Sequence, residues 1–270
     1  MNKIPVGIQV YSVRDLAQND LKGTLQQLKD MGYDGVELAG LYGHTAEEVR
    51  QILDEVGIPA ISAHVPYVEL LSDMEGTVQK YKRIGCKYIA VPYLTEEYRP
   101  GTPLFPEVVE NIRKIGKVCK ENDIVLLYHN HDFEFAKMKD GSYALDYLYD
   151  TVPADYLQTE LDTCWVRVGG EDPVAYIHKY AGRCPVVHLK DYVGTRSAHM
   201  YELIGIESKP EEKTEEFAFR PVGYGVQDMP AIVHAAIESG AEWVVVEQDQ
   251  SKERPSIEAA RMSIEYIRSL

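Results

Sequence analysis

The chain has 270 residues, a length that fits one large domain, since a single α/β barrel commonly runs to about 250 residues. Lysine and arginine total 28 and aspartate and glutamate total 43, so the formal net charge is −15. An acidic surface repels phosphate backbones and anionic headgroups, which excludes nucleic acid and membrane surfaces as expected partners. With 45% hydrophobic and 26% charged residues, the composition is typical of a soluble globular protein rather than a disordered chain.

The sequence shows no targeting or membrane segment. Residues 1–5 lead into a short apolar run that Gln9 and Arg14 interrupt, without the apolar core of a secretory signal. No stretch approaches the roughly 18 uninterrupted apolar residues of a membrane span. The cysteines lie far apart without a C-x-x-C pair, which predicts free thiols rather than a zinc ribbon or a disulfide framework; they are Cys86, Cys119, Cys164 and Cys184. We therefore expect a cytoplasmic protein.

Apolar, β-branched runs alternate with helical patterns along the whole chain. The runs that predict strands are residues 6–11, 35–38, 58–64, 87–92, 124–130, 157–162, 185–189 and 243–248. Between them, apolar residues recur at helical spacing, as at Val49, Ile52, Leu53 and Val56. Junctions from helix to strand carry a residue suited to a left-handed cap: Gly32, Gly57, Gly85, Gly182 and Gly240, with Asn122 as the alternative at a sixth junction.

A strict order of strand then helix, with buried strands, predicts a parallel sheet. Eight such units at this length fit a closed (β/α)8 barrel, which we expect to occupy residues 1–270 as a single domain. A doubly wound open sheet is the alternative. The first strand leads into Tyr11-Ser12-Val13-Arg14 rather than a glycine-rich phosphate fingerprint, so nothing in the sequence supports that alternative.

One connection is much longer than the others. Residues 192–226 follow the seventh predicted strand and contain the polar run 207–216, which has no helical apolar periodicity. A long loop in a compact domain is usually functional, and loops after barrel strands lie over the active-site face. We predict a lid there, with a solvated insertion of no catalytic role as the alternative.

Polar side chains gather where the predicted strands end. In a parallel barrel these ends converge on one mouth, and here they carry Glu37, His64, His129, Asn130, His131, Glu134, Glu160, Asp162, His188, Lys190, Asp191, Glu247, Gln248 and Asp249. Clustered carboxylates repel one another unless a cation lies between them. A mixture of carboxylates and imidazoles suits Mn²⁺, Co²⁺, Mg²⁺ or Zn²⁺, so the sequence predicts one bound divalent metal ion.

Several of these residues have a structural alternative. The alternative for His188 is a hydrogen-bonded core histidine, and the alternative for Asp162 is the N-cap of the next helix. Glu247 follows the apolar run 244–246, where an ionised group must be paired. On the fifth strand, regular alternation points Glu134 away from His129, unless a turn re-aims it.

At these residues the chain resembles the xylose isomerase-like barrel superfamily, the sugar phosphate isomerase/epimerase group that includes inosose dehydratase and tagatose 3-epimerase. Matching segments run through nearly the whole chain, and their joint order makes the resemblance specific. They are Gly7-Ile8-Gln9-Val10-Tyr11-Ser12, Gly35-Val36-Glu37-Leu38, Ser62-Ala63-His64, Tyr128-His129-Asn130-His131, Leu161-Asp162-Thr163, Val187-His188-Leu189-Lys190-Asp191, Gly223-Tyr224-Gly225 and Val246-Glu247-Gln248-Asp249.

The resemblance implies a (β/α)8 barrel with one divalent metal held by carboxylates and a histidine. Asp162, His188 and Glu247 match the family's ligands on the sixth, seventh and eighth strands. The epimerases have a glutamate on the fifth strand near the place of His129, a departure that points toward the dehydratase-like branch. The triplet Gly223-Tyr224-Gly225 also replaces the more usual glycine-glutamate-glycine.

We therefore predict a metal-dependent sugar or polyol isomerase or epimerase that abstracts a proton next to a carbonyl. The predicted metal ligands are Glu134, Asp162, His188 and Glu247. The predicted catalytic residues are Glu134, Glu247, His131 and Lys190, and the predicted substrate-binding residues are Glu37, His64, His129 and Trp165.

Two other functions stay open on the sequence alone. One is a dehydratase or β-eliminating lyase on a keto-sugar or inosose, and the other is a non-catalytic sugar-binding barrel. The expected partner is in every case a small sugar or polyol. The sequence leaves open which sugar it is, the identity of the metal and the formation of a homo-oligomer.

Overall fold

A closed barrel of eight parallel strands forms the centre of the protein. The computed structural model describes residues 4–196, 200–201 and 217–270. The strands are β1 (Val6–Gln9), β2 (Gly35–Ala39), β3 (Ala60–His64), β4 (Tyr88–Val91), β5 (Val125–His129), β6 (Gln158–Asp162), β7 (Val186–Leu189) and β10 (Trp243–Val246). Their order around the barrel is β1-β10-β7-β6-β5-β4-β3-β2, so all eight predicted strands are confirmed and the open-sheet alternative is excluded.

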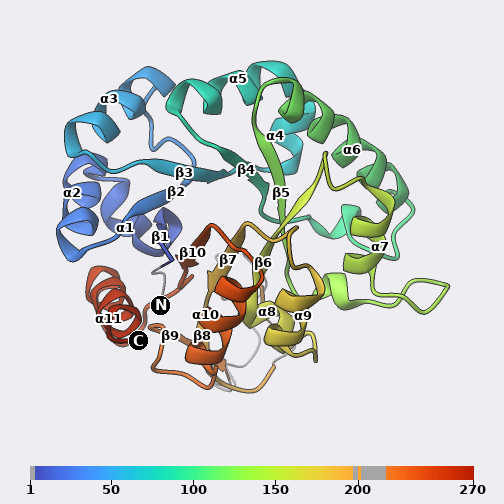
Figure 1. Cartoon of the computed structure of the whole chain (residues 1–270). Helices are drawn as coiled ribbons and strands as arrows, with labels where there is room; N and C mark the ends of the chain where they lie inside the picture. The colour runs from blue at the N-terminus through green and yellow to red at the C-terminus, as the bar shows by residue number, and fades with distance from the viewer. Residues whose placement is uncertain (1–3, 197–199, 202–216) are drawn as a thin grey trace.

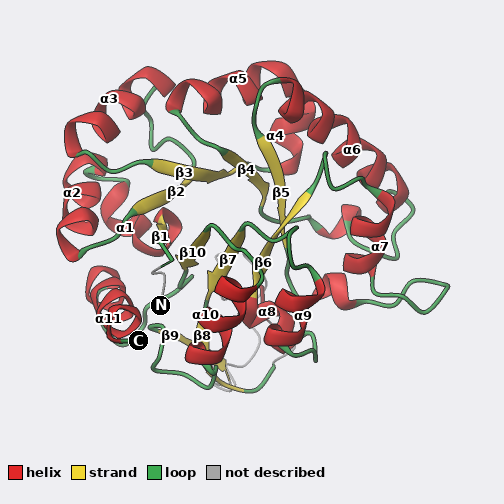
Figure 2. Ribbon diagram, viewed as in Figure 1, coloured by secondary structure: helices red, strands yellow, loops and turns green. Residues whose placement is uncertain are grey.

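Helices follow the strands and form a ring outside the barrel (Figures 1 and 2). The α-helices are α1 (Arg14–Ala17), α2 (Leu21–Met31), α3 (Ala46–Val56), α4 (Tyr67–Ser72), α5 (Met74–Ile84), α6 (Phe105–Glu121), α7 (Ala144–Thr151), α8 (Thr163–Val168), α9 (Pro173–Lys179), α10 (Met229–Glu238) and α11 (Ser256–Ser269). Short 3-10 turns are η1 (Val10–Val13), η2 (Glu96–Tyr98) and η3 (Phe133–Phe135).

The glycines predicted to end helices all adopt left-handed backbone conformations. Gly57, for example, closes α3 with φ 72°, a value that costs a residue with a Cβ atom about 1 kcal/mol or more. At the sixth junction, Asn122 caps α6 with φ −109°, and the following Asp123 takes the left-handed conformation with φ 59°. Aspartate tolerates this region because its short side chain can hydrogen-bond locally.

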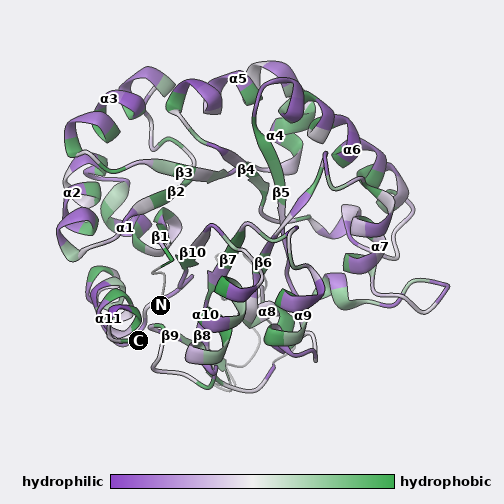
Figure 3. Ribbon diagram, viewed as in Figure 1, coloured by the Kyte–Doolittle hydropathy of each residue, from purple (hydrophilic) through white to green (hydrophobic). Residues whose placement is uncertain are grey.

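Alternation along the strands separates two apolar layers. Leu126 and Tyr128 of β5 belong to a large cluster between barrel and helices, whereas Leu127 belongs to a small cluster with Val186 and Val245. Because side chains two residues apart share a face, this small cluster lies inside the barrel beneath His129, His188 and Glu247. Figure 3 shows β4 and β5 as mainly hydrophobic and the helices as banded, in agreement with one buried stripe on each helix.

The long connection after β7 is only partly a loop. β8 (Asp191–Gly194) and β9 (Phe217–Arg220) pair antiparallel, so the expectation of a loop over residues 192–226 is wrong at residues 192–194 and 217–220. The physical reason is apolar burial, because Phe217 and Phe219 pack with Trp165 in a third cluster. The predicted lid falls mainly on residues 197–199 and 202–216, which lie outside the described residues.

The glycines at 223 and 225 have a structural explanation. The carboxylate of Asp191 accepts hydrogen bonds from the backbone N–H groups of Gly223, Gly225 and Gln227, at 3.0, 2.9 and 3.1 Å. A Cβ atom at position 225 would stand 2.1 Å from Oδ1 of Asp191. The segment after β9 is therefore folded around one carboxylate, and a larger residue at 225 would displace it.

Two further expectations concern the cysteines and the membrane. All four cysteines are free and buried, as predicted. Burial raises the pKa of the Cys86 and Cys119 thiols to about 12, which makes them poor nucleophiles. In the part of the chain that the structure describes, we find no helix that could span a membrane.

Gly116 offers a test of how closely α6 approaches the loop before β6. A Cβ atom there would lie 2.0 Å from the backbone oxygen of Tyr156. In a free helix, Gly→Ala stabilises by roughly 1 kcal/mol, but the overlap reverses the sign. We expect Gly116→Ala to lower the free energy of unfolding by about 1 to 3 kcal/mol in urea titrations. Lys117→Ala, at the exposed next position, serves as the control, and a stabilised Gly116→Ala would contradict the close approach.

Candidate metal centre and active site

Four ionisable side chains meet at the carboxyl ends of the strands. His129 ends β5, Asp162 ends β6, His188 lies on β7, and Glu247 directly follows β10. One ligand atom of each lies within 4.8 Å of the others, and all four residues are buried. We call these four residues the outer group. Three of them, Asp162, His188 and Glu247, are predicted metal ligands, and the structure brings these three together.

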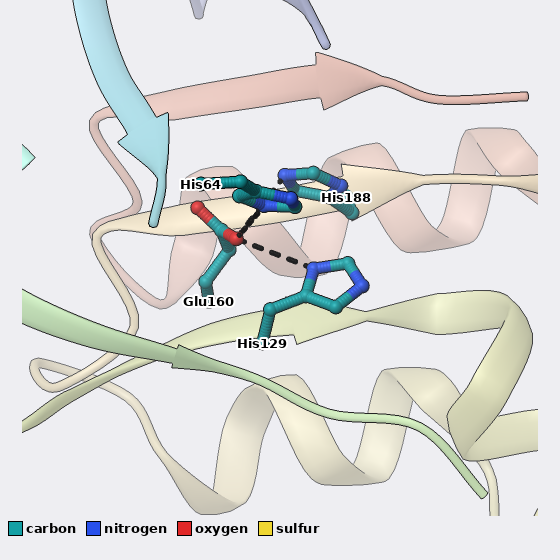
Figure 4. Close-up of side chains that lie close together, drawn as sticks. All are labelled: His64, His129, Glu160 and His188. Atoms are coloured by element: carbon teal, nitrogen blue, oxygen red, sulfur yellow. Dashed lines mark hydrogen bonds and ion pairs between the residues drawn. The ribbon is translucent and has the colours of Figure 1, made fainter. Parts of the chain in front are cut away.

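A second set lies one layer deeper and shares both imidazoles. His64, His129, Glu160 and His188 also have ligand atoms within 4.8 Å of one another, and we call them the inner group. Glu160 precedes Asp162 by two residues and so points into the same barrel below it. Figure 4 shows its carboxylate between the rings of His64 and His129, with His188 beside His64. The sequence placed Glu160 at a strand end but assigned it no role.

Lys190 supplies a positive charge to the outer group. Its Nζ atom lies 3.2 Å from Asp162, 3.1 Å from Glu247 and 2.9 Å from Asp249, and the residue is 1% exposed. Burial alone would lower the pKa of Lys190, but Asp162, Asp249 and Glu247 raise it well above the usual value. The ammonium is therefore charged, and it partly neutralises three carboxylates.

The imidazoles differ in their electrostatic surroundings. Burial, together with the neighbouring His188 and His64, holds the pKa of His129 well below the usual value, so this ring is neutral and has a free lone pair. Burial opposes the charge of His64, but Glu37 and Glu160 raise its pKa to about 10. Burial raises the pKa of Asp249 to about 7, against the pull of Lys190.

Asp162 performs the structural task that the sequence offered as an alternative, and it still faces the centre. Its Oδ1 atom accepts a hydrogen bond of 2.9 Å from the backbone N–H of Trp165 and so caps α8. Its Oδ2 atom lies 3.2 Å from Lys190 and 3.6 Å from Nε2 of His129. One oxygen therefore fixes the start of the helix while the other faces the possible ligands.

His188 is completely buried, as a core histidine would be, but its neighbours are carboxylates. Nδ1 lies 2.9 Å from Glu247, and Nε2 lies 2.9 Å from Glu37 and 3.5 Å from Glu160. A ring surrounded by negative charge on both edges can bind a cation on one edge and hold a proton on the other.

Glu134 lies outside both groups. The turn η3 does follow Asp132, but it does not aim the carboxylate at the centre. Glu134 accepts hydrogen bonds from the hydroxyl of Tyr128 at 2.6 Å and from the backbone N–H of His131 at 2.8 Å. Tyr128 points out of the barrel, opposite to His129, so Glu134 keeps the direction that regular alternation gives. Burial raises the pKa of Glu134 to about 8, and the β5 member of the outer group is His129 instead.

Aromatic rings continue the site beyond the outer group. The ring centroid of His131 lies 5.3 Å from that of His129 and 5.1 Å from that of Trp165, and the Nζ atom of Lys190 lies 5.4 Å from the Trp165 ring. Nδ1 of His131 and Nε1 of Trp165 are buried and find no hydrogen-bond partner among the described residues. Both polar atoms are therefore available to a substrate. The sequence missed Tyr93 and Tyr201, whose rings also face His131.

The two residues predicted to bind substrate on β2 and β3 contact each other: Glu37 is buried, and His64, which ends β3, is partly exposed. Glu37 is fully buried, and it accepts a hydrogen bond of 2.9 Å from the side chain of Gln9. Nε2 of His64 lies 3.1 Å from Glu37 and 2.7 Å from Glu160. Gln9 was missed, although a polar residue at the end of an apolar strand was a signal that could have found it.

With this geometry in place, comparisons with known proteins assign the family. The model described as "Xylose isomerase-like TIM barrel" matches residues 25–270. The chain belongs to the xylose isomerase-like TIM barrel family. The predicted resemblance and fold class are therefore confirmed.

Relatives and solved structures agree with this assignment. Inosose dehydratase of Geobacillus kaustophilus is 24% identical over 90% of this chain and 85% of its own length. A sugar phosphate isomerase/epimerase from Parabacteroides distasonis superposes with a TM-score of 0.77 at 21% identity, over 98% of this chain and 94% of that one. The IOLI protein "with a binding zinc atom" gives a TM-score of 0.73 at 15% identity, over 98% of each chain.

Removing the buried ammonium tests the electrostatic balance of the outer group. Lys190→Met leaves Asp162, Glu247 and Asp249 without their cation, and breaking a buried ion pair on one side costs about 3 to 5 kcal/mol. With chelator present, we expect the free energy of unfolding of Lys190→Met to be lower by this amount. Added Mn²⁺ should raise the free energy of unfolding more in the variant than in the wild type. Lys87→Met breaks an exposed pair with Glu242 and serves as the control. Equal effects of the two substitutions would contradict this role of Lys190.

Proposed function

We propose that this protein is a divalent-metal-dependent sugar or polyol isomerase or epimerase that abstracts a proton next to a carbonyl. The observation that carries the proposal is the outer group, in which two carboxylates and two imidazoles converge at the carboxyl end of the barrel. Active sites of (β/α)8 enzymes form at this end.

The outer group fits a divalent ion. Carboxylate oxygens and imidazole nitrogens together suit Mn²⁺, Co²⁺ or Zn²⁺, and the ligand atoms lie within 4.8 Å of one another, so small side-chain movements would let them share one ion. Oδ2 of Asp162 makes no hydrogen bond among the described residues, and it faces Nε2 of His129 at 3.6 Å as well as the Lys190 ammonium at 3.2 Å. His129, Asp162, His188 and Glu247 would hold the ion. When bound, it would polarise the carbonyl of the substrate and so acidify the neighbouring C–H bond.

The side chains around this ion divide the remaining work. Glu247 is the proposed base because its carboxylate is ionised. Burial alone would raise the pKa of Glu247, but Lys190 and His188 hold it well below the usual value. His131 and Trp165 offer ring nitrogens for hydrogen bonds to substrate hydroxyls. Lys190, paired with Asp162, Glu247 and Asp249, stabilises negative charge that develops on the substrate.

A second candidate is dehydration of a keto-sugar or inosose. Epimerisation needs proton transfer at both faces of one carbon, but on β5 the outer group contributes an imidazole rather than a second glutamate. Elimination of a β-hydroxyl requires one base and one acid, which Glu247 and Lys190 or His131 can supply. The name of the relative from Geobacillus kaustophilus, inosose dehydratase, favours the same outcome.

Glu247→Gln tests the proposed centre. The amide can neither act as a base nor balance the charge of the ion, so we expect turnover to fall by at least about 10³-fold while the barrel stays folded. Chelation should abolish wild-type turnover, and added Mn²⁺, Co²⁺ or Zn²⁺ should restore it. Glu242→Gln, at the opposite end of β10, is the matched control. Full activity of metal-free Glu247→Gln would overturn the proposal.

A screen in D2O separates the candidate functions. Keto-sugars, inososes and their phosphates are incubated with metal-loaded protein and followed by NMR. Deuterium at the carbon next to the carbonyl, with an isomer or epimer formed, supports the first candidate, and an unsaturated product supports the second. Saturable binding without deuterium incorporation or product would mean a sugar-binding barrel instead.

A further inference from the structure

The side chain of Glu160 lies among three imidazoles beneath the proposed centre. Its Oε2 atom lies 2.7 Å from Nε2 of His64, 3.2 Å from Nδ1 of His129 and 3.5 Å from Nε2 of His188 (Figure 4). Glu160 is completely buried, and β6 pairs it with the apolar Val186 of β7. A carboxylate is costly to bury at this depth, so its retention beside apolar neighbours needs a specific reason.

Each of the two imidazoles of the outer group has one ring nitrogen facing the outer group and the other facing the carboxylates of Glu37 or Glu160. Nε2 of His129 faces Asp162 and Glu247 at 3.6 and 3.8 Å, while Nδ1 faces Glu160. Nδ1 of His188 faces Glu247, while Nε2 lies 2.9 Å from Glu37. A neutral imidazole has one lone pair and one N–H. A ring that coordinates an ion through its outer nitrogen must therefore direct its proton toward the inner carboxylates.

This pattern also determines how the inner group can act. A second ion among Glu37, His64 and Glu160 would meet the inner N–H of His129 and His188 rather than their lone pairs. Each neutral ring would have to lose its remaining N–H proton before one ion could bind in the outer group and another in the inner group. For His129, the Glu160 carboxylate instead completes the arrangement in which a metal-binding histidine donates its other N–H to an acceptor.

We propose that Glu160 is a positioning residue for the metal centre: it accepts the inner N–H of His129 and thereby aims Nε2 of this ring at the ion. The inference rests on the function proposed above. Glu37 lies 2.9 Å from Nε2 of His188, as an ion-pair contact without a hydrogen bond. His64 lies between the two carboxylates and brings them together by contacting both.

Three variants test the proposal on the full chain. Glu160→Leu removes the acceptor at nearly constant volume, and Glu160→Gln keeps one acceptor oxygen without the charge. Thr159→Val is the control. Thr159 is as buried as its neighbour Glu160 on β6, but its side chain points to the opposite face of the strand. The dissociation constant for Zn²⁺ is measured by competition with a chelator. We expect it to rise about 10- to 100-fold in Glu160→Leu, several-fold in Glu160→Gln, and not at all in Thr159→Val.

Nitrogen NMR of histidine supplies a readout that a purely structural role would not change. In the Zn²⁺-loaded wild type, His129 should be protonated at Nδ1 and coordinated through Nε2. In Glu160→Leu the His129 signals should show mixed tautomers, while those of the exposed His234 stay unchanged. Assignment uses single His→Gln variants.

The outcomes distinguish this proposal from the one on which it rests. A wild type that binds no divalent ion overturns the proposed function, whereas a wild type that binds one ion with unchanged affinity in Glu160→Leu overturns only the role of Glu160. Two ions per wild-type chain, with one lost in Glu160→Leu, would make the inner group a second metal site and also overturn it. If Glu160→Leu does not fold, Glu160→Gln decides, because unchanged affinity and an unchanged His129 tautomer there contradict the proposal.

Discussion

The structure of the site depends on the gathering of buried carboxylates inside one barrel. Glu37, Glu160, Asp162, Glu247 and Asp249 are all nearly or completely buried, and Lys190 is the one buried lysine or arginine among the described residues. Ionised groups in such a place are stable only if they are paired or bind a cation. The imidazoles of His64, His129 and His188 therefore lie between the carboxylates, and a divalent ion in the outer group would complete the balance of charge.

The barrel makes this arrangement possible because it separates apolar and polar layers along each strand. Leu127, Val186 and Val245 fill its lower interior, and residues two positions further along the same strands are His129, His188 and Glu247. The outward faces of these strands pack against the helices. The apolar contacts of the fold therefore lie below and around the centre, and the carboxyl ends of the strands carry the ionisable groups.

One of these side chains serves fold and site at once. Asp162 caps α8 with one oxygen and faces Lys190 with the other, so a change at this residue would affect both the helix and the centre. Asp191, by contrast, accepts hydrogen bonds from backbone N–H groups of the segment after β9. Carboxylates that look alike in the sequence therefore perform different tasks, according to which donors the fold places around them.

The sequence by itself determined the eight strands, the helix ends and the polar strand ends, because these follow from local periodicity and from turn residues such as Gly57. It also identified Asp162, His188 and Glu247 as partners. Tertiary structure alone decided that His129 rather than Glu134 joins the outer group, that Glu160 lies against His129, and that β8 pairs with β9. Alternation gives the face on which a side chain lies, but its neighbours across the barrel depend on register and closure. His64 and Glu160, for instance, are 96 residues apart in the chain and meet only because the barrel closes.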